Sequence, residues 1–259
     1  MRIGERGSIV VRAWVRLTTL ACGVLLFAPS TTEGQTPSAP PADQWKVNFG
    51  GGLALTSGNK DTSTFNASYD VTYTPHDRRT FKSDALLLRG ETDGVVSSER
   101  FVLNVREEYR VDGRLFMFGQ SRYLHDRFKR IQYLVAPTGG LGFTAISTDA
   151  TTLTIDAGAG GVWEKNPFVD TRASGALTLS QKLTQTVSAS TTLTQSVSGL
   201  WKTQDLADAI YQFGVALALG INSHVQLKIE LLDSYSNKPT GDQTVKNDVS
   251  TIIAVVFRN

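Results

Sequence analysis

The stretch TSGNKDTSTFNASYDVTYTP, residues 56–75, decides the fold class. After a polar, glycine-containing segment, every second residue is aromatic or apolar and the residues between are polar; the first set is Phe65, Ala67, Tyr69, Val71 and Tyr73. Successive side chains of a β-strand point to opposite faces, so this segment predicts a strand with one apolar and one polar face. A soluble β-sandwich turns its apolar face inward, whereas a membrane β-barrel turns it outward.

The same alternation continues from Trp45 to the end of the chain, with the apolar set on odd-numbered positions. In HVQLKIELLDSY, residues 224–235, Val225, Leu227, Ile229 and Leu231 alternate with polar residues. Turn residues divide the pattern into strands of about ten or more residues, the length of a tilted membrane-spanning strand. The predicted strands cover residues 45–56, 62–74, 79–91, 98–111, 114–126, 130–147, 151–164, 169–182, 186–199, 206–220, 223–236 and 246–257.

The predicted connections alternate in length. Short turns are expected at HDRR (76–79), DGR (112–114), STDA (147–150), LTQ (183–185) and residues 221–223. Longer loops are expected at ETDGVVSSE (91–99), EKNPFVD (164–170), LWKTQD (200–205) and SNKPTGDQTV (236–245). An even number of strands with short turns at one end is typical of bacterial outer-membrane barrels, and the short turns then face the periplasm.

The charged residues indicate which face meets water. A Lys or Arg facing lipid at the bilayer midplane costs roughly 2–4 kcal/mol, so charges of both signs on one face favour an interior lumen. We expect the lumen charges to include Lys82, Asp84, Arg106, Glu108, Arg110, Arg122, Lys228 and Glu230. The sequence therefore predicts an all-β protein, a transmembrane antiparallel up-and-down β-barrel of about 12 strands, with aromatic girdles that include Trp45, Tyr73, Trp163 and Tyr235.

The N-terminus is typical of a secretory signal peptide. Four arginines precede the apolar run LTTLACGVLLFAP, residues 17–29, and small or polar residues follow. We expect cleavage between Ala28 and Gln35, which divides the chain into a signal peptide at 1–34, a short periplasmic linker at 35–44 and the barrel at 45–259. Cys22, the only cysteine, lies in the leader. The mature chain can then form neither a disulfide nor a zinc–thiolate site.

Composition excludes several classes of function. A formal net charge of +2 over 259 residues gives no reason to expect nucleic-acid binding. After the leader, no stretch approaches the roughly 20 apolar residues that a spanning helix needs. No cofactor or metal site is predicted.

The C-terminal segment NDVSTIIAVVFRN, residues 247–259, places Val249, Thr251, Ile253, Val255 and Phe257 on the apolar face. A last strand that ends in an aromatic residue resembles the recognition signal of the barrel assembly machinery, here read at Phe257. Arg258 and Asn259 follow, whereas most such strands stop at the aromatic residue. An ordinary hydrophobic strand is the alternative.

Scattered glycines and aromatics carry a resemblance to a known family. Trp45 with Gly50-Gly51, the segment 57–61 (SGNKD), Asp126 with Phe128 and Ile131, the segment 140–143 (GLGF), and Tyr235 with Pro239 and Asp248 together resemble the DUF481 family, a group described as salt-induced outer membrane proteins. The resemblance covers residues 45–257. It implies an outer-membrane barrel and brings no catalytic residues.

Two groups of residues are candidates for a function on the outer surface. His125 is the one histidine expected at the extracellular end, where it would serve as the base of a lipid hydrolase with Ser121 or Ser97, but no nucleophile motif marks either serine. We therefore expect no enzyme. In LHDRFKR, residues 124–130, Arg127, Lys129 and Arg130 are candidates for contacts to lipopolysaccharide phosphates. A solvated loop without a function is the alternative.

These observations predict a protein of the cell outer membrane that is surrounded by outer-membrane lipids, including lipopolysaccharide. We expect a monomer with a structural or stress-related role, or a narrow channel for small solutes. A lipid-modifying enzyme is the alternative, and a secreted soluble sandwich comes third.

Overall fold

A computed structural model of the chain describes residues 44–56, 62–76, 78–127, 129–167, 170–239 and 246–258. The predicted leader and the linker up to residue 43 lie outside these ranges. The described residues form twelve strands: β1 (Gln44–Thr56), β2 (Thr62–His76), β3 (Arg79–Thr92), β4 (Val95–Arg110), β5 (Leu115–Asp126), β6 (Ile131–Ser147), β7 (Thr151–Lys165), β8 (Arg172–Ser188), β9 (Thr191–Lys202), β10 (Asp205–Gly220), β11 (Val225–Ser236) and β12 (Asn247–Arg258). No helix within these ranges is long and apolar enough to cross a membrane.

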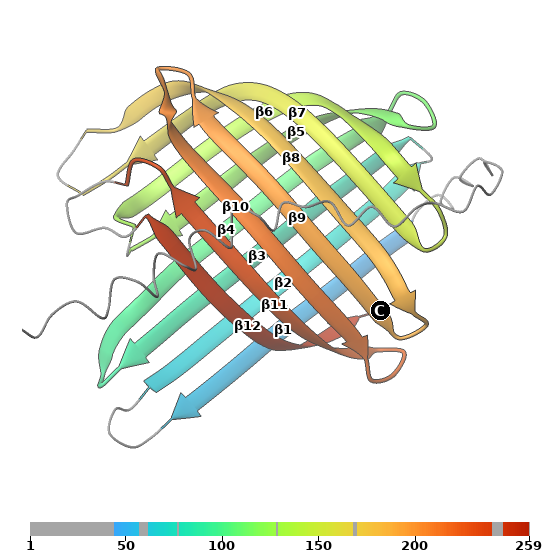
Figure 1. Cartoon of the computed structure of the whole chain (residues 1–259), viewed down its shortest axis with the longest axis horizontal. Coiled ribbons are helices and arrows are strands. Elements are labelled where there is room, and N and C mark those ends of the chain that lie inside the picture. Colours follow the sequence, from blue (N-terminus) through green and yellow to red (C-terminus); the bar gives the residue numbers. More distant parts are fainter. Residues whose placement is uncertain are drawn as a thin grey trace, which may run out of the picture. The chain divides into compact units, whose positions relative to one another are not determined.

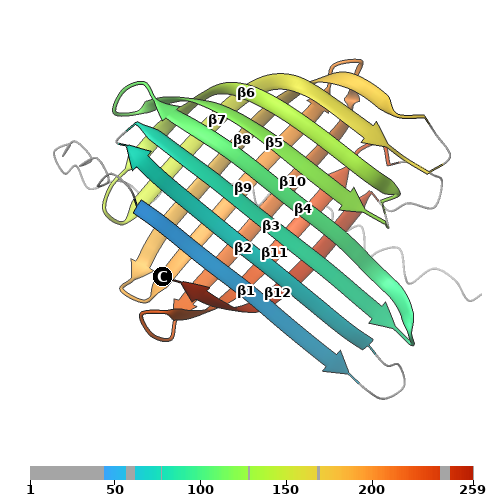
Figure 2. The same cartoon turned by 180° about the vertical axis from the view of Figure 1, so that it is seen from behind.

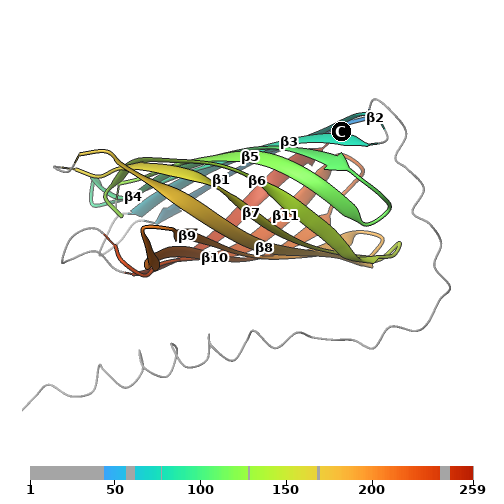
Figure 3. The ribbon, with the colours of Figure 1, turned by 90° about the horizontal axis from the view of Figure 1, so that it is seen from above.

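The strands form one closed antiparallel barrel. Each strand pairs with its neighbours in sequence, and β1 pairs with β12 to complete the ring (Figure 1). Figure 3 shows the two sides of the barrel, with β8, β9 and β10 on one and β2, β3 and β5 on the other. The predicted architecture is confirmed. We call the end that carries the start of β1 and the end of β12 the turn end, and the opposite end the loop end.

The strand bounds correct three predicted connections. Residues 183–185, predicted as a turn, continue β8, and the chain reverses instead at Ala189-Ser190. Two predicted longer loops are tight turns, one at Thr203-Gln204 and one at Asp93-Gly94. Both Asp93 and Gly94 have positive φ, 52° and 74°, as the common two-residue hairpin turn requires. The contrast in connection length between the two ends is therefore weaker than predicted.

The outer surface of the barrel is apolar between two polar rims. Exposed large side chains stand on odd-numbered positions, as predicted; examples are Phe49, Leu87, Leu141, Leu179 and Ile253. Outward charges gather near the strand ends, where Arg79 pairs with Glu107 (3.8 Å) at the turn end and Arg89 with Glu91 (3.0 Å) at the loop end. An apolar band bounded by charge suits a bilayer with its headgroup layers.

Aromatic side chains mark both edges of this band. At the turn end Trp45 stacks on Tyr73 with ring centroids 4.1 Å apart, and Tyr73 lies 6.4 Å from Phe81. At the loop end Trp201 donates a hydrogen bond to the Tyr211 hydroxyl (3.1 Å), and Tyr211 lies 6.2 Å from Tyr235. Tyr and Trp favour the membrane–water interface because they combine an apolar body with a polar tip.

Bulges interrupt the odd–even rule in places. The register shifts between Thr144 and Ile146 on β6 and between Asp205 and Ala209 on β10. At each shift an exposed apolar residue is even-numbered, Ile146 at 39% and Leu206 at 58% exposed. An odd number of extra residues, one on β6 and three on β10, exchanges the two faces, which alternation alone does not reveal.

Glycines allow β6 and β7 to approach each other closely. A Cβ on Gly140 would lie 2.0 Å from the Ala157 carbonyl oxygen, and one on Gly160 would lie 2.1 Å from the Pro137 carbonyl oxygen. Both contacts are with backbone atoms, which cannot move aside as a side chain can. The glycine clusters therefore serve sheet curvature and packing.

The closing seam is much shorter than the other ladders. β1 pairs with β2 from Gln44 to Thr56, but with β12 only from Asn48 to Gly51, opposite Arg258 to Val255. Figure 2 shows β1 and β12 next to each other. Above the ladder, the Asn66 amide of β2 reaches the Ile253 carbonyl oxygen (3.5 Å). The space it uses exists because Gly52 has no side chain.

Candidate functional site

The barrel interior holds a cavity of about 670 Å³ on the side formed by β3 to β10. At the turn end its mouth is lined by residues of the turns, Arg78 and Asp112 to Arg114. Toward the loop end it stops at apolar side chains, Leu124, Leu134, Ala136, Leu200 and Ile210. We call this space the turn-end cavity.

Six of the eight predicted lumen charges line this cavity: Lys82, Asp84, Arg106, Glu108, Arg110 and Arg122. Lys228 and Glu230 pair with each other on β11 (2.7 Å) and are not part of its lining. The placement follows from the even-numbered positions of these residues, which face the interior. Sequence reasoning thus located most of the charged wall.

Arg106 is the centre of an ion-pair network on this wall. Its Nε lies 2.7 Å from Glu108 Oε1 and its Nη2 lies 3.1 Å from Asp156 Oδ2. Lys82 Nζ approaches the other Glu108 oxygen at 2.7 Å. The guanidinium also lies over the Phe118 ring, 3.9 Å from its centroid. The network bridges β4 and β7, which are not neighbours in the sheet, and so fixes the shape of the wall.

The opposite wall carries mainly hydroxyl groups, beside two charged residues, Asp156 on β7 and Lys182 on β8. β7, β8 and β9 present Thr154, Thr178, Ser180, Ser196 and Ser198 to the cavity. Arg122 joins the two walls, because its Nη1 donates a hydrogen bond to Gln212 Oε1 (2.5 Å) and so links β5 to β10. The cavity combines a wall rich in charged side chains with a facing wall rich in hydroxyl donors and acceptors, which suits a small hydrophilic solute.

An apolar cluster closes the interior toward the loop end. Its members are buried, with Leu134 and Val162 each 1% exposed; the full set is Val102, Leu124, Ile131, Leu134, Ala136, Val162 and Ala176, with Leu200 and Ile210 packed against it. We did not predict this cluster. Its signal is an apolar residue on an even position next to apolar odd ones, as in Leu134-Val135-Ala136. Such a segment is apolar on both faces.

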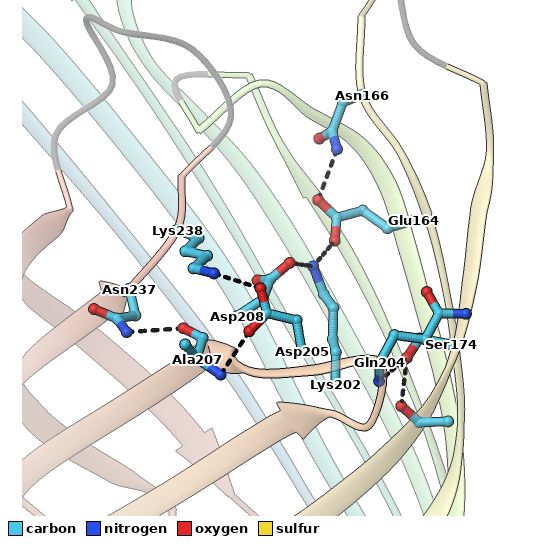
Figure 4. Close-up of polar contacts among 11 residues, drawn as sticks. Glu164, Asn166, Ser174, Lys202, Gln204, Asp205, Ala207, Asp208, Asn237 and Lys238 are labelled. Atoms are coloured by element: carbon cyan, nitrogen blue, oxygen red, sulfur yellow. Dashed lines mark hydrogen bonds and ion pairs between the residues drawn. The ribbon is translucent and has the colours of Figure 1, made fainter.

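A polar layer lies on the loop side of the apolar cluster. Lys202 Nζ is held between Glu164 Oε2 (2.5 Å) and Asp208 Oδ2 (2.8 Å), and the Asn166 amide donates to Glu164 (2.8 Å) (Figure 4). Lys238 pairs with Asp205 at the rim (Figure 4). We call the apolar cluster and this ion-paired layer together the loop-end barrier.

The β5–β6 connection corrects one of the predicted surface cations. Lys129 is 6% exposed, and its ammonium donates to the Ser234 carbonyl (2.7 Å) and hydroxyl (3.1 Å) on β11. Burial, the largest cause, and the neighbouring Arg100 lower the pKa of Lys129. Lys129 therefore links the β5–β6 connection to β11 inside the barrel, next to the loop-end barrier defined above. Arg127 and Arg130 are exposed, as predicted, and Arg127 lies 3.3 Å from Glu99.

His125 is engaged with backbone at the loop end. Its Nδ1 lies 2.8 Å from the Gln132 carbonyl oxygen. Ser121 stands four positions away on the same strand, a separation of about 13 Å at 3.3 Å per residue. Ser97 is exposed on β4. The described residues place neither serine in hydrogen-bonding contact with His125. They also contain no group of three His, Cys, Asp or Glu that could hold a metal ion.

The barrel is similar to several solved structures. A NanC porin is 11% identical, with 83% of this chain and 97% of that chain covered and a TM-score of 0.46. An outer membrane channel from Pseudomonas putida F1 is 13% identical, with 88% and 98% covered and a TM-score of 0.46. The translocator domain of the autotransporter NalP from Neisseria meningitidis is 11% identical, with 96% of each chain covered and a TM-score of 0.47.

The search of curated proteins found no match. Residues 49–258 match the family described as "Protein of unknown function, DUF481". This range covers nearly the whole barrel, from β1 to the end of β12, and the chain therefore belongs to the DUF481 family.

Proposed function

We propose that this protein is a narrow channel for small solutes in the outer membrane, at rest in a state closed by the loop-end barrier. The observation that carries the proposal is the turn-end cavity of about 670 Å³, which is lined by charged and hydroxyl side chains up to its apolar floor and is enclosed by the barrel wall. Barrels of about eight strands are just filled by side chains, and twelve strands leave room for more. A purely structural barrel has no need of such a space.

The construction of the barrier supports a channel that can open. Its apolar side chains come from the strands of the wall and from Ile131 at the start of β6, and its ion pairs join β7, β9 and β10. Rotamer changes and exchange of ion-pair partners would then be enough to pass a small solute. The structural or stress-related role is the competing proposal.

Conductance in planar bilayers tests the proposal. Leu134 is 1% exposed at the centre of the barrier, so Leu134→Ala together with Leu124→Ala should widen the constriction. We expect the double variant to give reproducible channels with at least several-fold higher open probability or conductance than wild type. Leu141→Ala, a matched change on the lipid face where Leu141 is 55% exposed, should behave as wild type.

The channel would be refuted if neither wild type nor the widened variant conducts, provided that heat-modifiable gel migration verifies insertion. The structural role would then be preferred.

The orientation and partners follow as part of the proposal. Both ends of the barrel chain lie at the turn end, which we assign to the periplasm. We propose that the barrel is a monomer, that β12 with Phe257 is recognised by the barrel assembly machinery, and that Arg127 and Arg130 contact lipopolysaccharide phosphates at the loop end. Charge removal at both arginines should then reduce lipopolysaccharide co-purification.

We also propose that the barrel is not a lipid hydrolase. His125 is engaged with the Gln132 carbonyl and has no serine partner among the described residues. His125→Ala should leave lipid A and phospholipid composition unchanged. A changed lipid composition in that variant would support the lipid hydrolase instead.

A further inference from the structure

We infer that the turn-end cavity binds small oxyanions, namely carboxylates or phosphates of hydrophilic solutes. This inference rests on the proposed function, because it names the class of solute for the same cavity. Its basis is the charge of the lining. The lining contains seven cationic side chains, Arg78, Lys82, Arg106, Arg110, Arg114, Arg122 and Lys182, against four carboxylates, Asp84, Glu108, Asp112 and Asp156.

The carboxylates are largely occupied by partners within the wall. Glu108 and Asp156 are paired with Lys82 and Arg106. Asp112 accepts hydrogen bonds from the backbone N–H groups of its own turn. Asp84 accepts a hydrogen bond from the Asn104 amide (2.7 Å). The excess positive charge of the lining is therefore not neutralised by these groups.

Lys182 and Arg122 are the cations best placed to take a ligand. Neither forms an ion pair with any carboxylate of the described residues, although both lie within electrostatic range of Asp84. Lys182 is exposed to the lumen from β8. Arg122 uses Nη1 for Gln212, while its Nε is buried and without a hydrogen-bond partner. The two cations face Asp84 from opposite walls; Lys182 also lies within electrostatic range of Asp70 and of Glu108, but Glu108 is already paired with Lys82 and Arg106, so the lining keeps an excess of positive charge.

Hydroxyl groups surround the same space. Thr178 Oγ1 lines the cavity and is buried without a partner, and Ser196 lies beside Lys182 on the adjacent strand. A multivalent oxyanion can accept hydrogen bonds from hydroxyls and from charged donors together, and hydrogen bonds to ionised groups are roughly twice as strong as neutral ones. A cation would be repelled by the excess positive charge of the lining, and a neutral sugar would gain no charge attraction from it.

The mouth favours the same class of solute. Arg78, Arg110 and Arg114 stand at the turn end, where the cavity opens, and form no ion pair with a carboxylate among the described residues. With one carboxylate, Asp112, against these three arginines, the mouth is net positive, and a net positive opening concentrates anions near its entrance. Anions would therefore be drawn in from the turn end.

Isothermal titration of the purified barrel in detergent tests the inference without requiring conduction. Citrate and pyrophosphate serve as probes for the two oxyanion sources, with glucose and spermidine as neutral and cationic comparisons. We expect citrate, pyrophosphate or both to bind, to weaken as salt is raised, and to bind at least tenfold more weakly to Lys182→Gln/Arg122→Gln. Arg89→Gln, which removes an outward cation at the loop end, should bind as wild type.

Several outcomes would overturn the inference: no oxyanion binding by folded wild type, equal affinity in the double variant, or preferential binding of spermidine. Lys182→Gln alone guards against misfolding, because its side chain is exposed in the lumen, and it should give part of the loss. Conduction without oxyanion binding would refute the inference about oxyanions but support the proposed channel. Oxyanion binding without conduction would support the inference but refute the channel.

Discussion

At the residue scale, neighbouring side chains of one strand meet opposite environments. On β7, Thr154 lines the cavity, while the next residue, Ile155, is 41% exposed on the outer surface. The odd–even rule predicted this division and most lumen charges. The separate prediction that Lys129 lies on the outer surface was wrong, because a loop side chain can fold inward and follows no strand period.

The Asp112 turn gives a pH-dependent prediction. Its carboxylate accepts hydrogen bonds from the backbone N–H groups of Leu115 (2.7 Å) and Arg114 (2.8 Å), and these bonds hold the pKa of Asp112 below its ordinary value of 3.8. Because the folded pKa is depressed, the stability they contribute is present above the unfolded value and is lost as pH falls through the folded one.

Asp112→Ala should therefore unfold at lower urea than wild type at pH 7, and the difference should shrink as the pH is taken below the ordinary value of 3.8. Urea titrations over a pH series measure this. Asp112→Asn keeps an acceptor oxygen and should lose less. A difference in urea midpoint between Asp112→Ala and wild type that stays the same at every pH would contradict this role of Asp112.

Gly140 gives a steric prediction. A Cβ there would lie 2.0 Å from the Ala157 carbonyl oxygen and 2.6 Å from the Gly158 Cα, both on the paired strand. Overpacking of this kind costs typically about 1–3 kcal/mol, so Gly140→Ala should lower the free energy of unfolding by that amount. The urea midpoint should fall accordingly. Gly119→Ala, at a site with nothing within 4 Å, is the control. Equal midpoints for the two variants would exclude a close approach of β6 and β7.

At the element scale, the twelve strands were predictable because each one alternates over a long run between turn residues. The turns were less predictable. The tripeptide LTQ at 183–185, predicted as a turn, lies inside β8, and the same tripeptide at 193–195 lies inside β9. The seam between β1 and β12 was not predictable at all, because the register of a closing pair depends on the stagger of the whole ring.

The short seam predicts a local weakness that a covalent link should remove. Gly51 and Val255 are register partners, and a Cβ on Gly51 meets nothing nearer than 3.9 Å, so a cysteine fits there. Residues 45–259 contain no other cysteine. The oxidised Gly51→Cys/Val255→Cys variant should keep its folded gel mobility to higher temperature than its reduced form.

Gel migration after heating, with and without reductant, measures this. A disulfide that forms but leaves the unfolding temperature unchanged would show that the seam does not limit stability. Each single cysteine variant is a control for the substitutions themselves.

At the scale of the whole molecule, closure converts alternation into an inside and an outside. The sequence indicated a charged lumen but could not reveal that its loop half is apolar. Leu124, Leu134, Val162 and Ala176 come together from four strands, and each looks like an ordinary strand residue in its own segment. The unpaired state of Lys182 and Arg122 was equally hidden, because ion pairing inside a barrel depends on side chains from facing walls.

Cysteine labelling in lipid vesicles tests the inside–outside assignment most directly. Cysteines are placed one at a time at Thr154, Ile155, Thr80 and Phe81, and exposed to a small, charged, water-soluble thiol reagent. Thr154 and Thr80 line the cavity, while Ile155 and Phe81 are 41% and 38% exposed on the outer surface. We predict rapid labelling at both threonine positions and protection at Ile155 and Phe81. Labelling at Ile155 and Phe81 with protection at the threonine positions would contradict a barrel that faces lipid with its apolar side.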